Sequence, residues 1–187
     1  ESYDAESLIK QVSLPIVKAV GETGLDYFHS QENKKEQIKL FQLNLDLACR
    51  FNKPVIVHSR ASNKDTLSML QEYVNNITDY PGVLHCFTLD LHCAKKLLDL
   101  GMMISFSGIV TFNNAEELRN VVPYIPDEQL LIETDAPYLA PVPKRGKENE
   151  PGFIKYTAME LAKIRGCSIE YLSDITTKNA KRLFRLD

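Results

Sequence analysis

Short apolar runs alternate with longer segments of helical periodicity along this chain, and this alternation constrains its fold more than any other feature. The runs are rich in Val, Ile, Leu and Met and are bounded by Gly, Pro or polar residues, which is typical of strands buried on both faces. We predict strands at Ile16–Val20, Pro54–Val57, Val83–Leu84, Met102–Phe106 and Leu130–Ile132.

The segments between these runs repeat apolar residues at steps of three and four, which predicts amphipathic helices. Ile38, Phe41, Leu45 and Ala48 form the clearest stripe. The predicted helices lie near residues 38–48, 67–77, 91–98, 118–122, 154–164 and 169–184, the last with Ser168 as its N-cap.

Strands that alternate with helices predict an α/β fold, either a doubly wound sheet or a TIM-type (β/α) barrel. A doubly wound sheet often binds its ligand beside a glycine-rich phosphate loop, and the sequence contains neither GxGxxG nor GxxxxGK[ST]. In a barrel, the chemistry lies at the ends of many different strands. The polar residues described next follow that pattern, so we favour a barrel, with residues 1–187 as a single domain.

Four residues able to bind a divalent cation each end an apolar run in this interpretation: Glu22, His58, His85 and Asp135. The first two gaps between them each span about one strand–helix unit, and the third spans two. Taken singly, a strand-end histidine is more often structural, and a strand-end carboxylate is often a cap or turn residue. Four at successive strands favour a site for Mg²⁺, Mn²⁺ or Zn²⁺, which would activate water for hydrolysis.

Other polar residues have more open interpretations. Glu133 shares a strand face with Asp135, and we expect either a buried carboxylate paired with a lysine or arginine, or a catalytic group. Arg60 is placed to bind a substrate phosphate through its planar fork, although a surface salt bridge is about as plausible. The basic residues Lys144, Arg145 and Lys147 fit a solvated loop or a contact with a nucleic-acid backbone.

Composition narrows the class of protein. With 44% hydrophobic and 25% charged residues the chain is an ordinary globular protein, and we expect a cytoplasmic location, or a nuclear one in a eukaryote, with no membrane contact. The four cysteines form no CxxC pair, which predicts reduced thiols. A net charge of −3 argues against a broad basic face for duplex DNA, but not against a nuclease whose bound cations supply positive charge.

Seven ordered blocks resemble the signature segments of the TatD family. They are Gly21-Glu-Thr-Gly-Leu-Asp-Tyr27, Pro54-Val-Ile-Val-His-Ser-Arg60, Val83-Leu-His-Cys-Phe87, Ser105-Phe-Ser-Gly108, Leu131-Ile-Glu-Thr-Asp-Ala-Pro-Tyr-Leu139, Asn149-Glu-Pro151 and Asn179-Ala-Lys-Arg-Leu-Phe184. The resemblance implies a TIM-barrel metallohydrolase of the amidohydrolase type. It also implies a metal-dependent deoxyribonuclease, which we expect to act as an exonuclease on single-stranded DNA or DNA ends, with no protein partner.

The resemblance also implies roles for the four candidate ligands. Glu22 would bridge two divalent cations, and His58 and His85 would hold one of them. Asp135 would hold the other and accept a proton from the attacking water.

One departure from the family pattern affects these expectations. Family members begin with a strand that carries a His-x-His pair, followed by two more strands, whereas no histidine precedes His29 here. We therefore expect a barrel that lacks its first three strands, one well-formed metal site at most, and little activity from the 187-residue chain alone; metal stoichiometry would test this. The alternatives are a related metallohydrolase of a small ester, lactone or amide, and a catalytically impaired fragment that serves as a binding module.

Overall fold

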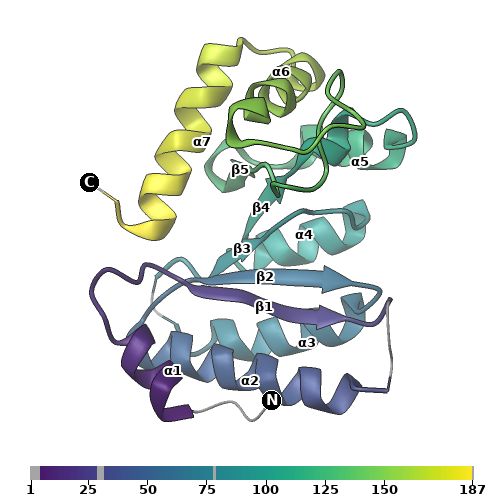
Figure 1. The fold of residues 1–187 in the computed structure, drawn as a ribbon. Helices are drawn as coiled ribbons and strands as arrows, with labels where there is room; N and C mark the ends of the chain where they lie inside the picture. The colour runs from purple at the N-terminus through teal and green to yellow at the C-terminus, as the bar shows by residue number, and fades with distance from the viewer. Residues whose placement is uncertain (1–4, 29–31, 78, 187) are drawn as a thin grey trace.

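The computed structural model describes residues 5–28, 32–77 and 79–186, which contain a five-stranded parallel sheet (Figure 1). The strands pair in the order in which they occur in the sequence, so each chain connection crosses over to the adjacent strand. This confirms the predicted α/β class with a parallel sheet. The interpretation of this sheet as a barrel that lacks its first three strands stays a prediction. The strands are β1 (Val20–Asp26), β2 (Val55–Arg60), β3 (Gly82–Leu84), β4 (Met103–Phe106) and β5 (Leu130–Ile132).

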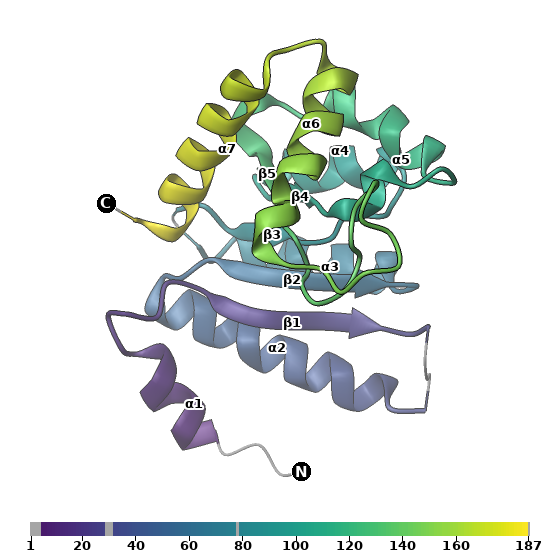
Figure 2. The same cartoon turned by 45° about the horizontal axis from the view of Figure 1, so that its top comes forward.

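Helices occupy the crossovers and the C-terminal part of the chain. Figures 1 and 2 show α2 and α3 running alongside β1 and β2, with α7 beside β5. All six predicted helices are present, and the Ser168 hydroxyl accepts a hydrogen bond from the Tyr171 amide (3.1 Å), as expected of an N-cap. The helices are α1 (Ala5–Val12), α2 (Lys34–Phe51), α3 (Asn63–Val74), α4 (Leu91–Asp99), α5 (Glu116–Val121), α6 (Ile154–Arg165) and α7 (Ile169–Phe184); the short 3₁₀ helices are η1 (Gly108–Thr111), η2 (Val122–Tyr124), η3 (Asp127–Gln129) and η4 (Pro151–Phe153).

The hydrophobic core lies between the sheet and these helices. Phe41, Leu45 and Ala48 of the predicted α2 stripe are buried, as are Val55 and Val57 of β2. Burying a side chain of this size contributes roughly 1.5–3 kcal/mol relative to leaving it in water. The core therefore fixes β1 and β2 against α2, and these two strands carry half of the candidate metal ligands.

The predicted strand at Ile16–Val20 is wrong. Ile16 is 83% exposed, and the strand begins only at Val20. The preceding residues instead form a turn after α1, in which the Val17 amide donates to the Leu14 carbonyl (3.1 Å). The strand continues through Asp26 because its residues pair with β2 up to Arg60, and this tertiary pairing overrides the weak strand preference of its glycines and acidic residues.

Two further findings concern membrane-spanning helices and the cysteines. Within the described ranges, no helix is both long and apolar enough to span a membrane. Cys49, Cys86, Cys93 and Cys167 are all free thiols, as the sequence predicted.

Candidate metal centre

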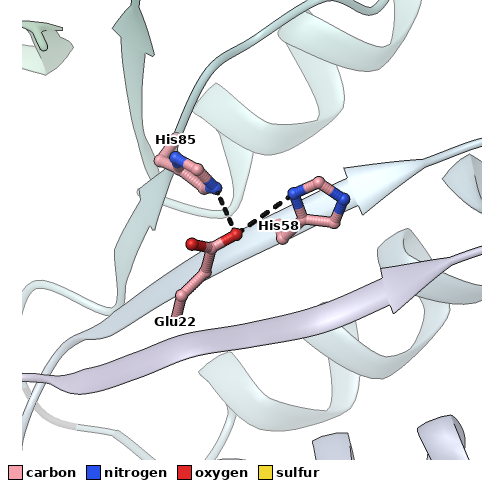
Figure 3. Close-up of side chains that lie close together, drawn as sticks. All are labelled: Glu22, His58 and His85. Carbon is pink, nitrogen blue, oxygen red and sulfur yellow. Dashed lines mark hydrogen bonds and ion pairs between the residues drawn. The ribbon is translucent and has the colours of Figure 1, made fainter. Parts of the chain in front are cut away.

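The side chains of Glu22, His58 and His85 converge on one point above the first three strands (Figure 3). Glu22 Oε1 lies 2.8 Å from His85 Nε2 and 3.2 Å from His58 Nδ1. One carboxylate oxygen therefore faces a ring nitrogen of each histidine. Three of the four candidate ligands predicted from the sequence thus come together, with Glu22 in contact with both histidines.

The backbone positions of the ligands differ from the prediction that each ends a strand. Glu22 lies inside β1, where the pairing with β2 shifts register between Val20 and Thr23, and His58 lies inside β2. Only His85 directly follows its strand, and Asp135 comes three residues after β5. For Glu22 and His58 the prediction failed because the apolar runs end before the backbone pairing does.

A glycine allows β1 to approach β2 closely at this point. Gly24 pairs with His58 in the strand register and has a φ of +144°. A Cβ atom on Gly24 would lie 1.9 Å from the His58 carbonyl oxygen, which is far inside a van der Waals contact. Glycine is therefore needed at this position both for its conformation and for the space it leaves.

Each histidine also contacts a second carboxylate through its other ring nitrogen. His58 Nε2 lies 3.3 Å from Asp26 Oδ2, and His85 Nδ1 lies 3.2 Å from Glu133 Oε1. Carboxylates in this position fix the orientation and tautomer of histidines that bind metals, and they make the ring a better ligand. The expected pairing of Glu133 with a lysine or arginine is therefore wrong, because its partner is His85.

Sequence reasoning did not single out Asp26. Its carboxylate is held by the Phe28 amide, which donates to Oδ1 (2.9 Å). The Gln37 side chain bonds both the amide and the carbonyl of Asp26, each at 2.8 Å. The available signal was the spacing, because Glu22 and Asp26 are four residues apart and such residues line one face of a strand.

Asp135 lies next to this cluster, beside His85 and Glu133. Ligand atoms of His85, Glu133 and Asp135 all lie within 4.8 Å of one another, as do those of Glu22, His58 and His85. His85 thus belongs to both groups. Burial, followed by the negative charge of Glu133, raises the pKa of the Asp135 carboxyl.

The donor set suits a divalent cation in its charge. Four carboxylates (Glu22, Asp26, Glu133, Asp135) surround two imidazoles, and this surplus of negative charge favours a bound cation. Burial disfavours a protonated His85, yet its hydrogen bonds with Glu133 and Glu22 and their charges raise the pKa of His85 to about 9. In the metal-free protein the proton on His85 therefore balances part of the negative charge of the carboxylates, which a bound cation would otherwise balance.

The donor set also suits a divalent cation in its spacing. Metal–ligand bonds of about 2.0–2.2 Å in a tetrahedral site place neighbouring ligand atoms roughly 3.4 Å apart. The separations of 2.8 and 3.2 Å from Glu22 Oε1 are shorter than this, so the ligand atoms need to move apart by about 0.2–0.6 Å to admit the cation. A divalent cation held by Glu22, His58 and His85 fits the residues present.

The loop after β5 is fixed by Asn149, which is 4% exposed. The Asn149 side-chain amide donates to the carbonyls of Thr134 (2.7 Å) and Tyr138 (2.6 Å). These bonds bracket Asp135 and hold its backbone, which has a φ of +60°. The Asn149-Glu-Pro151 block thus supports the loop that carries a candidate ligand.

The basic residues have different environments. The Arg60 guanidinium lies 3.9 Å from the centre of the Phe28 ring, and Arg60 lines a cavity of about 490 Å³ with His58, His85 and Asp135. The Arg145 guanidinium lies 3.8 Å from the centre of the Phe112 ring, and Lys144 lies over Phe153 at 5.3 Å. Lys144 and Arg145 therefore lie over aromatic rings of their own protein, within a largely exposed loop that agrees with the expected solvated loop.

Asp26 gives the first test of this arrangement. Because its carboxylate orients His58, we expect Asp26→Ala to weaken Mn²⁺ or Zn²⁺ binding by about 10–100-fold. Asp26→Asn should lose less metal affinity, since the amide oxygen of asparagine can still accept a hydrogen bond from His58. Calorimetric titration measures both, with Asp99→Ala at the exposed end of α4 as the matched control. Equal affinities for Asp26→Ala and the control would contradict the orienting role.

Comparison with known proteins identifies the family of this chain. The chain matches the family model described as TatD related DNase over residues 1–185. It is 50% identical over 187 residues to the uncharacterized metal-dependent hydrolase YcfH of Escherichia coli (strain K12), a match that covers 100% of this chain and 70% of the relative. It is 34% identical over 187 residues to a protein named 3'-5' ssDNA/RNA exonuclease TatD from Pectobacterium carotovorum, covering 97% of this chain and 71% of that protein.

A solved structure extends the likeness to the fold. The crystal structure of YJJV, a TatD homolog from Escherichia coli K12, aligns with a TM-score of 0.90 at 30% identity, over 98% of this chain and 70% of that one. The fold and the cluster of histidines and carboxylates define a metal-dependent hydrolase. This chain belongs to the TatD related DNase family, as its sequence blocks predicted.

Proposed function

We propose that the protein hydrolyses phosphodiester bonds of DNA, as a TatD-like deoxyribonuclease that acts as an exonuclease. The observation that carries this proposal is the Glu22–His58–His85 cluster, with Asp135 and Arg60 in the adjoining cavity. Its ligand set suits a hard or borderline divalent cation. The relative named as an exonuclease for single-stranded DNA and RNA supports this choice of substrate.

The proposed roles follow from the contacts. Glu22, His58 and His85 would hold one divalent cation (Mg²⁺, Mn²⁺ or Zn²⁺), and Asp135 would contribute to a second site that the described residues do not complete. Bound cations supply the Lewis-acid chemistry that makes water nucleophilic near neutral pH and stabilises charge on the phosphodiester. Asp26 and Glu133 orient the two histidines through their outer nitrogens.

Two residues act on water and substrate in this proposal. Asp135 accepts a proton from the attacking water, because it lies beside the cluster and is held by the Asn149-supported loop. Arg60 binds a non-bridging phosphate oxygen through its guanidinium, which lines the same cavity as Asp135.

Metal-dependent cleavage of a single-stranded oligonucleotide tests the proposal. We expect slow shortening of the oligonucleotide from one end with Mg²⁺, Mn²⁺ or Zn²⁺, complete loss of cleavage with chelator, and recovery when the cation is returned. A parallel panel of small esters, lactones and phosphotriesters should react much more slowly. Chelator-sensitive hydrolysis of a panel member without cleavage of DNA would instead support a small-molecule hydrolase.

A further inference from the structure

Tyr138 is a large, exposed aromatic residue beside the candidate metal centre. Its side chain is 71% exposed. It lines the same cavity of about 490 Å³ as His58, His85 and Asp135, within the roughly 300–1,000 Å³ of typical small-molecule sites. Isolated exposed aromatic residues are common on protein surfaces. Tyr138 differs from them because it lines the cavity of the candidate metal centre.

The Tyr138 backbone is fixed from several sides. Its amide donates to the Asp135 carbonyl (2.9 Å), and its carbonyl accepts a hydrogen bond from buried Asn149 (2.6 Å). A Cβ atom on Gly108 would lie 2.2 Å from the Leu139 carbonyl oxygen, so the loop packs directly on η1. The loop that carries Tyr138 is thus fixed beside the metal centre, so binding a ligand has to order the Tyr138 side chain but not its backbone.

The Tyr138 side chain makes no interaction that would explain its position. Among the described residues, none hydrogen-bonds to its hydroxyl and no ring or cation stacks on it. Tyr27 and Tyr73 differ, because their hydroxyls donate to Asp65 (2.9 Å) and to the Pro81 carbonyl (2.8 Å). The Tyr138 ring therefore offers an open aromatic face to whatever enters the cavity.

The other groups in the cavity indicate what that ligand is. Arg60 provides a cationic fork suited to a phosphate, and the candidate metal ligands provide a second site for anionic oxygens. A ligand that matches an aromatic face, a guanidinium and a cation together carries a planar ring and a phosphate. A nucleotide within a nucleic-acid strand has both.

We propose that Tyr138 stacks on the base of the nucleotide next to the phosphodiester that is cleaved, an inference that rests on the proposed function. A base inside a duplex already has both faces stacked on its neighbours, so the ring binds only an unpaired base. The site therefore takes single strands or frayed ends and tolerates any base, because every base has a π-face.

Abasic oligonucleotides test the stacking directly. Two single-stranded oligonucleotides of equal length are compared, one with all its bases and one whose two terminal nucleotides at each end are abasic. The measured quantity is the kcat/KM of the metal-loaded enzyme for the oligonucleotide with all its bases, divided by its kcat/KM for the abasic one. We expect a ratio of about 10 for the wild type, about 1 for Tyr138→Ala, and a value near the wild type for Tyr138→Phe, which keeps the ring.

Tyr124→Ala serves as the control, because Tyr124 is also an exposed tyrosine (57%) but lines a different cavity, next to α5. Its ratio should equal that of the wild type. An unchanged ratio in Tyr138→Ala, with an active wild-type enzyme, would overturn the stacking and leave the proposed function intact. A wild-type enzyme that cleaves neither oligonucleotide would overturn the proposed function and this inference with it.

Discussion

Replacing Glu22 by glutamine should lower the rate of DNA cleavage by more than about 100-fold and abolish tight metal binding. Loss of a residue that only orients a metal ligand lowers metal affinity or activity by about 10–100-fold. Glu22 is itself a candidate ligand that both histidines face, so its loss should have a larger effect. Glutamine keeps the shape but removes the charge and directs an amide at one of the ring nitrogens. The rate is measured with a labelled single-stranded oligonucleotide at saturating Mn²⁺.

The same change should leave the fold intact, because the Glu22 side chain is 52% exposed. Thermal unfolding of the metal-free variant should match that of the metal-free wild type within a few degrees. Glu116→Gln, at an exposed position in the first turn of α5, is the control and should keep full activity. Near-normal cleavage by Glu22→Gln would show that the cluster is not the catalytic centre.

Gly24→Ala is expected to be among the most destabilising single substitutions near the site. The added methyl group would lie 1.9 Å from the His58 carbonyl oxygen at a φ of +144°, so β1 must move away from β2. Backbone strain of about 1–3 kcal/mol adds to a similar cost of overpacking, so we expect a loss of roughly 3 kcal/mol or more. Chemical denaturation of the metal-free protein measures this loss.

Gly146→Ala separates the two causes. Gly146 also has a positive φ (+81°), but a Cβ atom there would meet nothing within 4 Å. Only the backbone cost of about 1–2 kcal/mol is then expected. If both variants lost the same stability, the close approach of β1 to the His58 carbonyl would not be the cause.

The helices could be predicted from the sequence because a helix displays its buried face at a fixed period. Phe41, Leu45 and Ala48 repeat at steps of three and four and are all buried. The first strand could not be placed, because Val20–Asp26 contains two glycines and two acidic residues and acquires its conformation from pairing with β2. The apolar residues before it, such as Ile16, form an exposed turn instead.

In the candidate site, the sequence indicated which residues take part but not how their side chains pair. Residue type and order indicated that Glu22, His58 and His85 would meet, since the ends of parallel strands lie along one edge of a sheet. The partners of Asp26 and Glu133 depend on strand register and on the direction of each side chain. The four-residue spacing from Glu22 indicates the strand face on which Asp26 lies, but it does not show that His58 is its partner. For the same reason the sequence did not identify His85 as the partner of Glu133.

Anomalous diffraction from crystals grown with Mn²⁺ or Zn²⁺ tests the central claim most directly. We predict a peak about 2.0–2.3 Å from Glu22 Oε1, His58 Nδ1 and His85 Nε2, with Asp26 and Glu133 still bonded to the outer nitrogens of the two histidines. A cation bound elsewhere, with Glu22 still hydrogen-bonded to both rings at a saturating metal concentration, would contradict the account.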